Sequence, residues 1–356
     1  MWRAAFNLLL AIHPLVGGPL FAPLGIQKFS WRADPWLRVF LGGSGLFALG
    51  QIDAGVDVAG STLGQGLLGW LVLRAGQLIG PHPTYAIGIT GVGVWAFCRW
   101  FAELETHPWY REQLWSYNPN GLGAWMALGG ALSVLLVRPG WLGALGFVGA
   151  GLGLWASGSR AALLGLLLAG GLAFALRLPR FWRVVLGLGI VVALVASLSG
   201  RFDLGRFGTV LDLSYRTSQQ RLEIWRIALE AFREHPISGV VSLAEYSSNH
   251  LSERARELSI TEISHAHNLF LQALAEGGIL GGLGAFFWVA GATWLLLHLR
   301  AWKGLALLGV VVILNLADYT FFNAGVYYPL WIGLAWSISC SSPSVNSNFD
   351  RPDPLR

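Results

Sequence analysis

Few ionisable side chains interrupt the long apolar segments of this 356-residue sequence. A charged group near the hydrocarbon of a membrane is costly, so it usually occupies a cavity or a pairing site, and chemistry is sought there first. Guanidinium groups in such places bind anions, an imidazole transfers protons, and a carboxyl orients a partner or links two helices. The candidates are Arg160, Arg221, His265, His267, Glu276 and Asp318, followed by Arg74 and Arg99.

Arg160 follows Ser157-Gly158-Ser159 at the predicted start of a helix. A cation there meets the positive end of the helix macrodipole, whereas backbone N–H groups together with an Arg suit an anion. We expect an anion to bind at Arg160; the alternative is that its side chain extends to lipid headgroups. Arg221 lies near Arg216 on an amphipathic helix and is typical of a solvated face, unless that helix folds over the pocket of Arg160 and His267.

The pair His265 and His267 allows three interpretations. A zinc site needs three or four ligands, and the other external histidines lack supporting spacing. The pair is otherwise a structural one held by hydrogen bonds, or one neutral imidazole acts as a general base at the membrane surface. Glu276 and Asp318 form hydrogen bonds between helices, orient a histidine, or do both; hydrogen bonding between helices is the first interpretation.

Several common reaction types leave no motif in the sequence. There is no Walker A loop, Gly-x-Ser-x-Gly, His-Glu-x-x-His or Asp-x-Asp. Gly64-Gln65-Gly66-Leu67-Leu68-Gly69 has the spacing of a dinucleotide-binding loop, but no strand precedes it and it falls inside a predicted span. Asp53 and Asp57 are the one weak indication of a metal. A nucleotide-driven reaction is therefore disfavoured, and no cofactor is expected.

The elements that must position these residues are membrane-spanning helices. Hydrophobic residues make up 54% of the chain and charged residues 12%, which excludes a water-soluble globule. The apolar residues form blocks of about 17–22, long enough to cross a bilayer as helices. The fold class predicted is an all-α polytopic membrane protein with about eleven spans. They lie near 4–22, 36–52, 62–80, 85–103, 121–137, 140–157, 160–177, 182–199, 277–298, 304–320 and 324–340.

The distribution of charge orients these spans. Basic short loops, such as those at Arg138 and Lys303, are placed in the cytoplasm by the positive-inside rule. The hydrophilic segment 200–264, with an amphipathic helix over Gln219–Glu234, then lies outside, as does the loop 53–61. The chain thus divides into spans 1–8 (1–199), the external loop (200–264), spans 9–11 (265–340) and a disordered cytoplasmic tail (341–356). The first segment is read as a retained span rather than a cleaved signal peptide.

The net charge of +5 includes no long basic run, so nucleic acid is not an expected partner, whereas anionic membrane lipids are.

Together, four sequence segments resemble the O-antigen ligase and O-antigen polymerase superfamily of bacterial membrane glycosyltransferases. The resemblance covers about residues 115–298. The segments are Ser116-Tyr117-Asn118-Pro119-Asn120; Ser157-Gly158-Ser159-Arg160-Ala161-Ala162; Arg221-Leu222-Glu223-Ile224-Trp225 with His235-Pro236-Ile237-Ser238-Gly239; and His265-Ala266-His267-Asn268 with Leu274-Ala275-Glu276-Gly277-Gly278.

The resemblance implies a metal-independent, inverting transfer of a glycan from undecaprenyl diphosphate to an acceptor hydroxyl. The site would face the periplasm from the inner membrane, and twelve spans are common in the family. Arg160 and Arg221 would bind the diphosphate, and His267 would be the base. Substrate contacts would come from Arg216, His265, Asn268 and Glu276, with His265 and Glu276 also orienting His267.

Other functions stay open at this point. The acceptor is a lipid A core in a ligase, a growing glycan in a polymerase, or a protein hydroxyl in an oligosaccharyltransferase. A transporter or flippase for a polyprenyl-linked sugar also needs an anion site, but it tends to show paired halves and charges deep in several spans. A non-catalytic scaffold for envelope assembly would lose nothing on replacement of His267.

Overall fold

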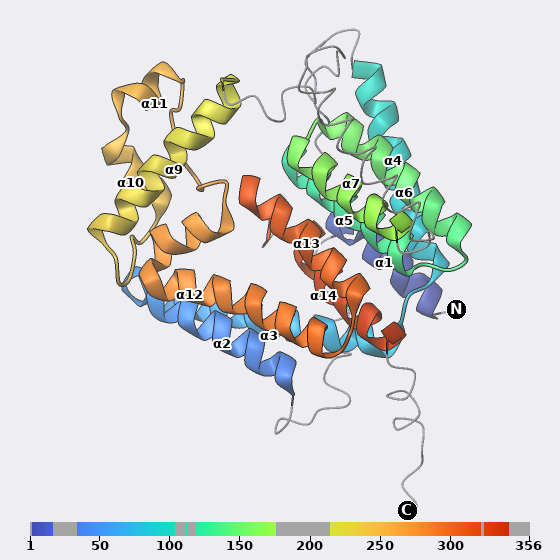
Figure 1. Cartoon of the computed structure of the whole chain (residues 1–356). Coiled ribbons are helices and arrows are strands. Elements are labelled where there is room, and N and C mark those ends of the chain that lie inside the picture. The colour runs from blue at the N-terminus through green and yellow to red at the C-terminus, as the bar shows by residue number, and fades with distance from the viewer. Residues whose placement is uncertain are drawn as a thin grey trace, which may run out of the picture.

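The computed structural model in Figure 1 describes residues 2–16, 34–103, 112, 118–175, 214–321 and 324–341, which form helices and loops without a strand. The predicted span 182–199 and most of the predicted tail lie outside these residues. The α-helices are α1 (Trp2–Val16), α2 (Pro35–Gly50), α3 (Val56–Ile79), α4 (Pro83–Glu103), α5 (Pro119–Leu136), α6 (Gly140–Ser157), α7 (Arg160–Ala175), α9 (Arg216–Glu234), α10 (Leu243–His250), α11 (Glu253–Glu257), α12 (Leu269–His298), α13 (Trp302–Ala317) and α14 (Ala324–Ser341).

Each predicted span that falls within the described residues coincides with a helix. By length and composition, α3, α5, α6 and α12 can cross a membrane, while α1, α7 and α13 contain shorter apolar stretches. The described part of the chain is therefore all-helical, and its long apolar helices are those of a multi-pass membrane protein. The count of about eleven spans stays a prediction.

One predicted boundary is wrong and a second leaves out part of a helix, and local chemistry explains both. The loop expected over 53–61 is mostly helical, because α3 begins at Val56 and places Asp57 in its first turn, where a carboxylate favours a helix N-terminus. The span predicted from 277 starts at a kink at Gly278, but the helix α12 already begins at Leu269. Asn268 caps it, since its Oδ1 accepts hydrogen bonds from the N–H groups of Phe270 and Leu271.

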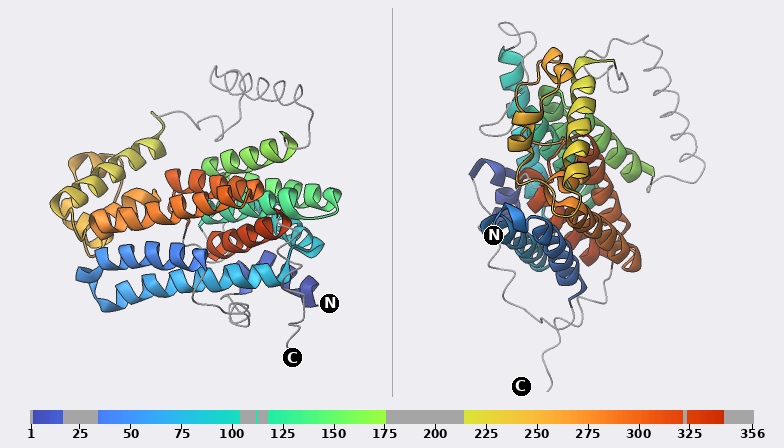
Figure 2. Two further views of the ribbon diagram at one scale, coloured as in Figure 1. Left: turned by 60° about the horizontal axis from the view of Figure 1, so that its bottom comes forward. Right: turned by 90° about the vertical axis from the view of Figure 1, so that its left-hand side faces the viewer.

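The bundle buries large side chains where helices distant in the sequence meet. Trp125 of α5 and Trp331 and Trp336 of α14 are almost fully buried, as is Trp288 of α12. The helices α2 and α12 pack side by side, and α2 also packs against α3 (Figure 2). The ring of Trp288 donates a hydrogen bond to the carbonyl of Phe40 at 3.4 Å, which joins α12 to α2.

Residues 214–268, here called the cap, form a second packed unit at one end of α2, α3 and α12 (Figure 2). The helix predicted over 219–234 is α9, which starts one turn earlier and ends where His235-Pro236 follows. The apolar face of α9 packs on α10 and α11, with Ile227, Leu243 and Ile263 almost fully buried. A separate core means that the cap has a defined shape of its own.

Backbone hydrogen bonds attach the cap to a kink in α12. Gly278 leaves the helical conformation at φ 57° and ψ −153°. Next to this kink, the N–H of Ile279 donates to the Pro236 carbonyl at 2.8 Å, and the N–H of Val240 donates to the Ala275 carbonyl at 2.7 Å. The His-Pro-x-x-Gly and Glu-Gly-Gly segments of the sequence are therefore the two halves of one joint.

Replacing Gly278 by alanine is expected to weaken this joint. A side chain at φ 57° costs about 1–2 kcal/mol, and its Cβ would also clash with the Ile237 carbonyl. We predict a lower melting temperature of the detergent-purified G278A variant and faster proteolysis between cap and bundle. The control is Gly151→Ala in α6, where an added Cβ meets no atom within 4 Å. Equal stability of the two variants would contradict the joint.

Candidate active site

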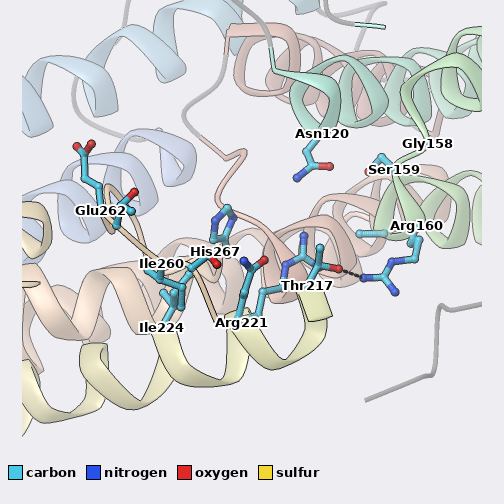
Figure 3. Close-up of a pocket in the computed structure, with 14 residues that line it drawn as sticks. Asn120, Gly158, Ser159, Arg160, Thr217, Arg221, Ile224, Ile260, Glu262 and His267 are labelled. Atoms are coloured by element: carbon cyan, nitrogen blue, oxygen red, sulfur yellow. Dashed lines mark hydrogen bonds between the residues drawn. The ribbon is translucent and has the colours of Figure 1, made fainter. Parts of the chain in front are cut away.

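A cavity of about 310 Å³ lies where the cap meets the ends of α5 and α7 (Figure 3). Arg160, Arg221 and His267 all line it, although they come from α7, α9 and the loop before α12. The structure thus brings together the three residues that the sequence singled out for anion binding and proton transfer. The remaining lining residues are Asn120, Gly158, Ser159, Ala161, Thr217, Gln220, Ile224, Ser259, Ile260, Thr261 and Glu262.

Arg160 is held from both the bundle and the cap. Gly158 ends α6 in the left-handed conformation, and α7 starts at Arg160, so the positive end of the α7 macrodipole borders the cavity. The guanidinium donates to Thr217 Oγ1 at 2.8 Å (Figure 3). It also lies 5.2 Å from the ring centroid of Tyr215. Both partners belong to the cap. The cap therefore fixes the position of the Arg160 side chain, which belongs to the bundle.

His267 is oriented by a buried carboxylate. Its Nδ1 lies 2.9 Å from Oδ1 of Asp318, whose side chain is 7% exposed against 26% for the histidine. The same carboxylate lies 4.0 Å from the guanidinium of Arg221 through Oδ2. Because a carboxylate only accepts hydrogen bonds, Nδ1 carries the proton and Nε2 is left as the basic nitrogen. Asp318 thus selects the histidine tautomer suited to a general base.

The backbone at His267 is strained and is held on both sides. Its φ of 51° lies in the left-handed region that a side chain seldom adopts. The preceding N–H, that of Ala266, donates to Gln272 Oε1 at 2.6 Å, and the following residue, Asn268, caps α12. Strain that the surroundings enforce is typical of functional positions, where it aims a side chain.

His265 packs against His267 and takes no part in the hydrogen bond with Asp318. The two rings are 4.3 Å apart at their centroids, and the ring of Tyr319 lies 6.0 Å from His265 on another side. Burial, with a smaller contribution from the neighbouring His267, holds the pKa of His265 below its usual value. It is therefore a neutral ring that supports His267.

Of the other residues predicted to contact the substrate, Arg216 lies at the rim of the cavity, and Asn268 and Glu276 form hydrogen bonds within the protein. Arg216 is exposed and donates to Ser259 Oγ, a cavity-lining hydroxyl, so it lies at the rim. Asn268 Oδ1 accepts the hydrogen bonds at the N-terminus of α12, and its Nδ2 donates to the Leu316 carbonyl at 3.0 Å. Glu276 accepts a hydrogen bond from the N–H of Leu243 at 3.0 Å. Asn268 therefore stabilises the start of α12, and Glu276 stabilises the joint. It is Asp318, and not Glu276, that orients His267.

Asp318 and Glu262 are the acidic residues of this site. Asp318, at the end of α13, orients His267 and by the same contact links α13 to the segment before α12, so it combines the two roles that the sequence allowed. Glu262 and Thr217 could not be recognised as site residues from the sequence, because the hydrophilic segment contains many similar residues. Arg74 and Arg99 lie elsewhere and pair with Asp34 and Glu112.

The histidine pair and Asp318 also form a set of metal-ligand type. One donor atom from each lies within 4.8 Å of the others. Three such ligands are the minimum for a zinc site. However, His267 Nδ1 and Asp318 Oδ1 already share a hydrogen bond, so a metal held by these atoms would have to displace it. Of the other external histidines, His107 lies outside the described residues, and His235 and His250 are exposed.

Residues 145–286 match the family model described as O-antigen ligase. This central region of the chain is therefore similar to the O-antigen ligase family. The match includes Arg160, Arg221 and His267, whereas Asp318 lies beyond its end. No protein of curated function matches the sequence. The resemblance noted in the sequence is confirmed, and this O-antigen ligase region contains both the cavity cations and the joint between cap and α12.

The depressed pKa of His265 predicts a pH dependence of stability. In the unfolded chain an unperturbed histidine takes up a proton near pH 6.5, whereas buried His265 does so only at lower pH. The unfolded state then binds more protons, so the free energy of unfolding falls as the pH drops through this window. Chemical unfolding of wild type and His265→Gln between pH 7.5 and 5.5 should show a shallower fall in the variant. Parallel curves would contradict the burial of a neutral His265.

Proposed function

We propose that this O-antigen ligase-type chain is a metal-independent, inverting glycosyltransferase. It moves a glycan from undecaprenyl diphosphate to an acceptor hydroxyl at the periplasmic face of the bacterial inner membrane. The observation that carries the proposal is the meeting of two guanidinium groups and an oriented imidazole in one cavity at the cap end of the bundle. Charges gathered at one end of the helices suit surface chemistry better than transport through a bundle.

The cations serve the leaving group. Arg160, at the positive end of α7, and Arg221 of α9 border the cavity from two sides. A diphosphate presents several oxygens to such donors, and guanidinium groups bind phosphate oxygens through paired hydrogen bonds. Negative charge grows on the diphosphate as its bond to the sugar breaks. Prearranged donors stabilise that charge, which is often the largest contribution to catalysis of this kind.

The imidazole serves the acceptor. His267 Nε2 removes the proton of the acceptor hydroxyl while that oxygen attacks the anomeric carbon. One bond forms between acceptor oxygen and anomeric carbon, and the bond from that carbon to the diphosphate oxygen breaks. The products are the glycosylated acceptor, undecaprenyl diphosphate and an imidazolium, whose charge Asp318 stabilises at 2.9 Å. A single displacement inverts the anomeric configuration.

Replacing a cavity cation or the base should greatly slow transfer. We expect kcat/KM of the purified protein with an undecaprenyl-diphosphate-linked glycan to fall about 10²–10³-fold in Arg160→Ala and Arg221→Ala. In His267→Ala the loss should be about 10²–10⁴-fold. The matched control is Arg233→Ala, an exposed arginine on α9 outside the cavity, which should transfer at the wild-type rate. Near-normal turnover of Arg160→Ala or His267→Ala would defeat these assignments.

Chelation separates the two interpretations of the histidine cluster. If His267 acts as a base held by Asp318, transfer proceeds at an unchanged rate in excess EDTA. If His265, His267 and Asp318 hold a catalytic zinc, EDTA abolishes transfer and added Zn²⁺ restores it, which would contradict the proposal.

Asp318→Asn tests the role of the carboxylate as a positioning group. The amide is the same size, but it cannot stabilise an imidazolium and permits the wrong tautomer of His267. We predict that kcat falls about 10²–10⁴-fold. Binding of a fluorescent undecaprenyl diphosphate and the melting temperature should stay close to wild type. Loss of donor binding or of stability in proportion to kcat would assign Asp318 a merely structural role.

A further inference from the structure

The base assigned to the transfer, His267, lies in an irregular segment of the chain. From Thr261 to His267, no backbone N–H donates to a backbone carbonyl of the residues that the structure describes. A segment without such bonds keeps a fixed shape only where other groups hold its backbone. Asp318 holds the imidazole ring, but the point from which this ring extends depends on the backbone at residues 266 and 267. The group that holds this backbone therefore decides where the base lies.

The side chain of Gln272 is the group that holds it. The N–H of Ala266 donates to Gln272 Oε1 at 2.6 Å, and the two residues are 0% and 2% exposed. A buried N–H that loses its partner carries the full cost of desolvation, because no water replaces the bond. Ala266 directly precedes His267, whose φ of 51° is strained. The Gln272 amide therefore stabilises a conformation that this segment would not keep by itself.

The other end of this amide is fixed as well. Because Oε1 is an acceptor, the NH₂ group of Gln272 is left as the donor, and it hydrogen-bonds to the carboxyl of Glu276, one turn further along α12. Glu276 in turn accepts the hydrogen bond from the N–H of Leu243, where α10 of the cap begins. A chain of hydrogen bonds thus runs from the cap through α12 to the residue before the base.

Packing alone does not explain an amide at position 272. The helix α12 is long and apolar enough to cross a membrane, and a buried polar side chain is unfavourable unless its polar atoms have partners. Both ends of the Gln272 amide have one. Leucine or methionine would fill a similar space without this requirement. Gln272 therefore serves the geometry of its partners rather than the packing of the helix.

We infer that Gln272 is a positioning residue for the transfer and that it acts by holding the backbone next to His267. The inference rests on the proposed function, in which His267 Nε2 removes the proton of the acceptor hydroxyl. A general base must lie within hydrogen-bonding distance of that proton, and a small displacement of the base slows the reaction. Asp318 sets the tautomer of the ring, and Gln272 sets the place from which the ring extends.

Gln272→Met tests this role, because methionine fills a similar space without an amide. We expect kcat with the undecaprenyl-diphosphate-linked glycan to fall about tenfold, as for a buried N–H left without its partner, with the KM for this donor unchanged. The matched control is Gln51→Met. Gln51 is also buried and accepts a hydrogen bond from Thr62 at 2.7 Å, but it lies outside the cavity of Arg160 and His267. Its kcat should equal that of wild type. Wild-type kcat in Gln272→Met, or an equal fall in Gln51→Met, would overturn the inference.

Combining Gln272→Met with His267→Ala separates positioning from a general loss of structure. If Gln272 acts only through His267, the double variant transfers at the residual rate of His267→Ala. A further tenfold loss in the double variant would assign Gln272 to the fold and would overturn the inference.

Hydrogen exchange tests the contact without relying on transfer. Mass spectrometry of the full-length protein in detergent should show faster deuterium uptake by the peptide over residues 261–268 in Gln272→Met, because the Ala266 N–H loses its partner. Uptake by this peptide should be unchanged in Gln51→Met. Unchanged uptake in Gln272→Met would contradict the inference. Faster uptake in Gln272→Met, combined with a wild type that transfers no glycan, would support the hold on the backbone and contradict the glycosyltransferase.

Discussion

The hydrogen bond between His267 and Asp318 is the interaction on which the candidate site depends. It sets the tautomer of the imidazole, and through Oδ2 the same carboxylate lies within 4.0 Å of Arg221. A buried carboxylate needs such partners, because an uncompensated charge away from water is strongly unfavourable. Base, orienting acid and one cation are therefore coupled: removing any of them alters the electrostatic surroundings of the other two.

This coupling requires the cap and the bundle to keep fixed positions relative to each other. Asp318 belongs to the end of α13 and Arg221 to the cap, while His267 lies where the cap joins α12. The joint at Gly278 and Gly239 holds these parts together by backbone hydrogen bonds, and Arg160 adds a side-chain hydrogen bond to Thr217. The glycines of the joint are thus structural requirements of the site, although they take no part in the chemistry.

Sequence reasoning found the parts of the site that carry an unusual signal. An arginine at a helix start and a histidine pair before an apolar helix stand out in a chain with 12% charged residues. Asp318 was visible as a carboxyl but its partner was not, because a contact across 51 residues leaves no local pattern. Asn268 stabilises the N-terminus of α12 and Glu276 stabilises the joint, and both roles depend on tertiary packing. The start of α12 at Leu269 depends on the side-chain cap from Asn268, and the start of α3 at Val56 is favoured by Asp57 in its first turn. Hydrophobicity records neither feature.

The most direct test of the account is the anomeric configuration of the transferred glycan, determined by NMR on the donor and on the product of one turnover by the purified protein. A single base held by Asp318, with no carboxylate reserved as a nucleophile, predicts inversion. Retention would require two displacements and a covalent intermediate on a carboxylate such as that of Glu262, which also lines the cavity, and would contradict the role assigned to His267.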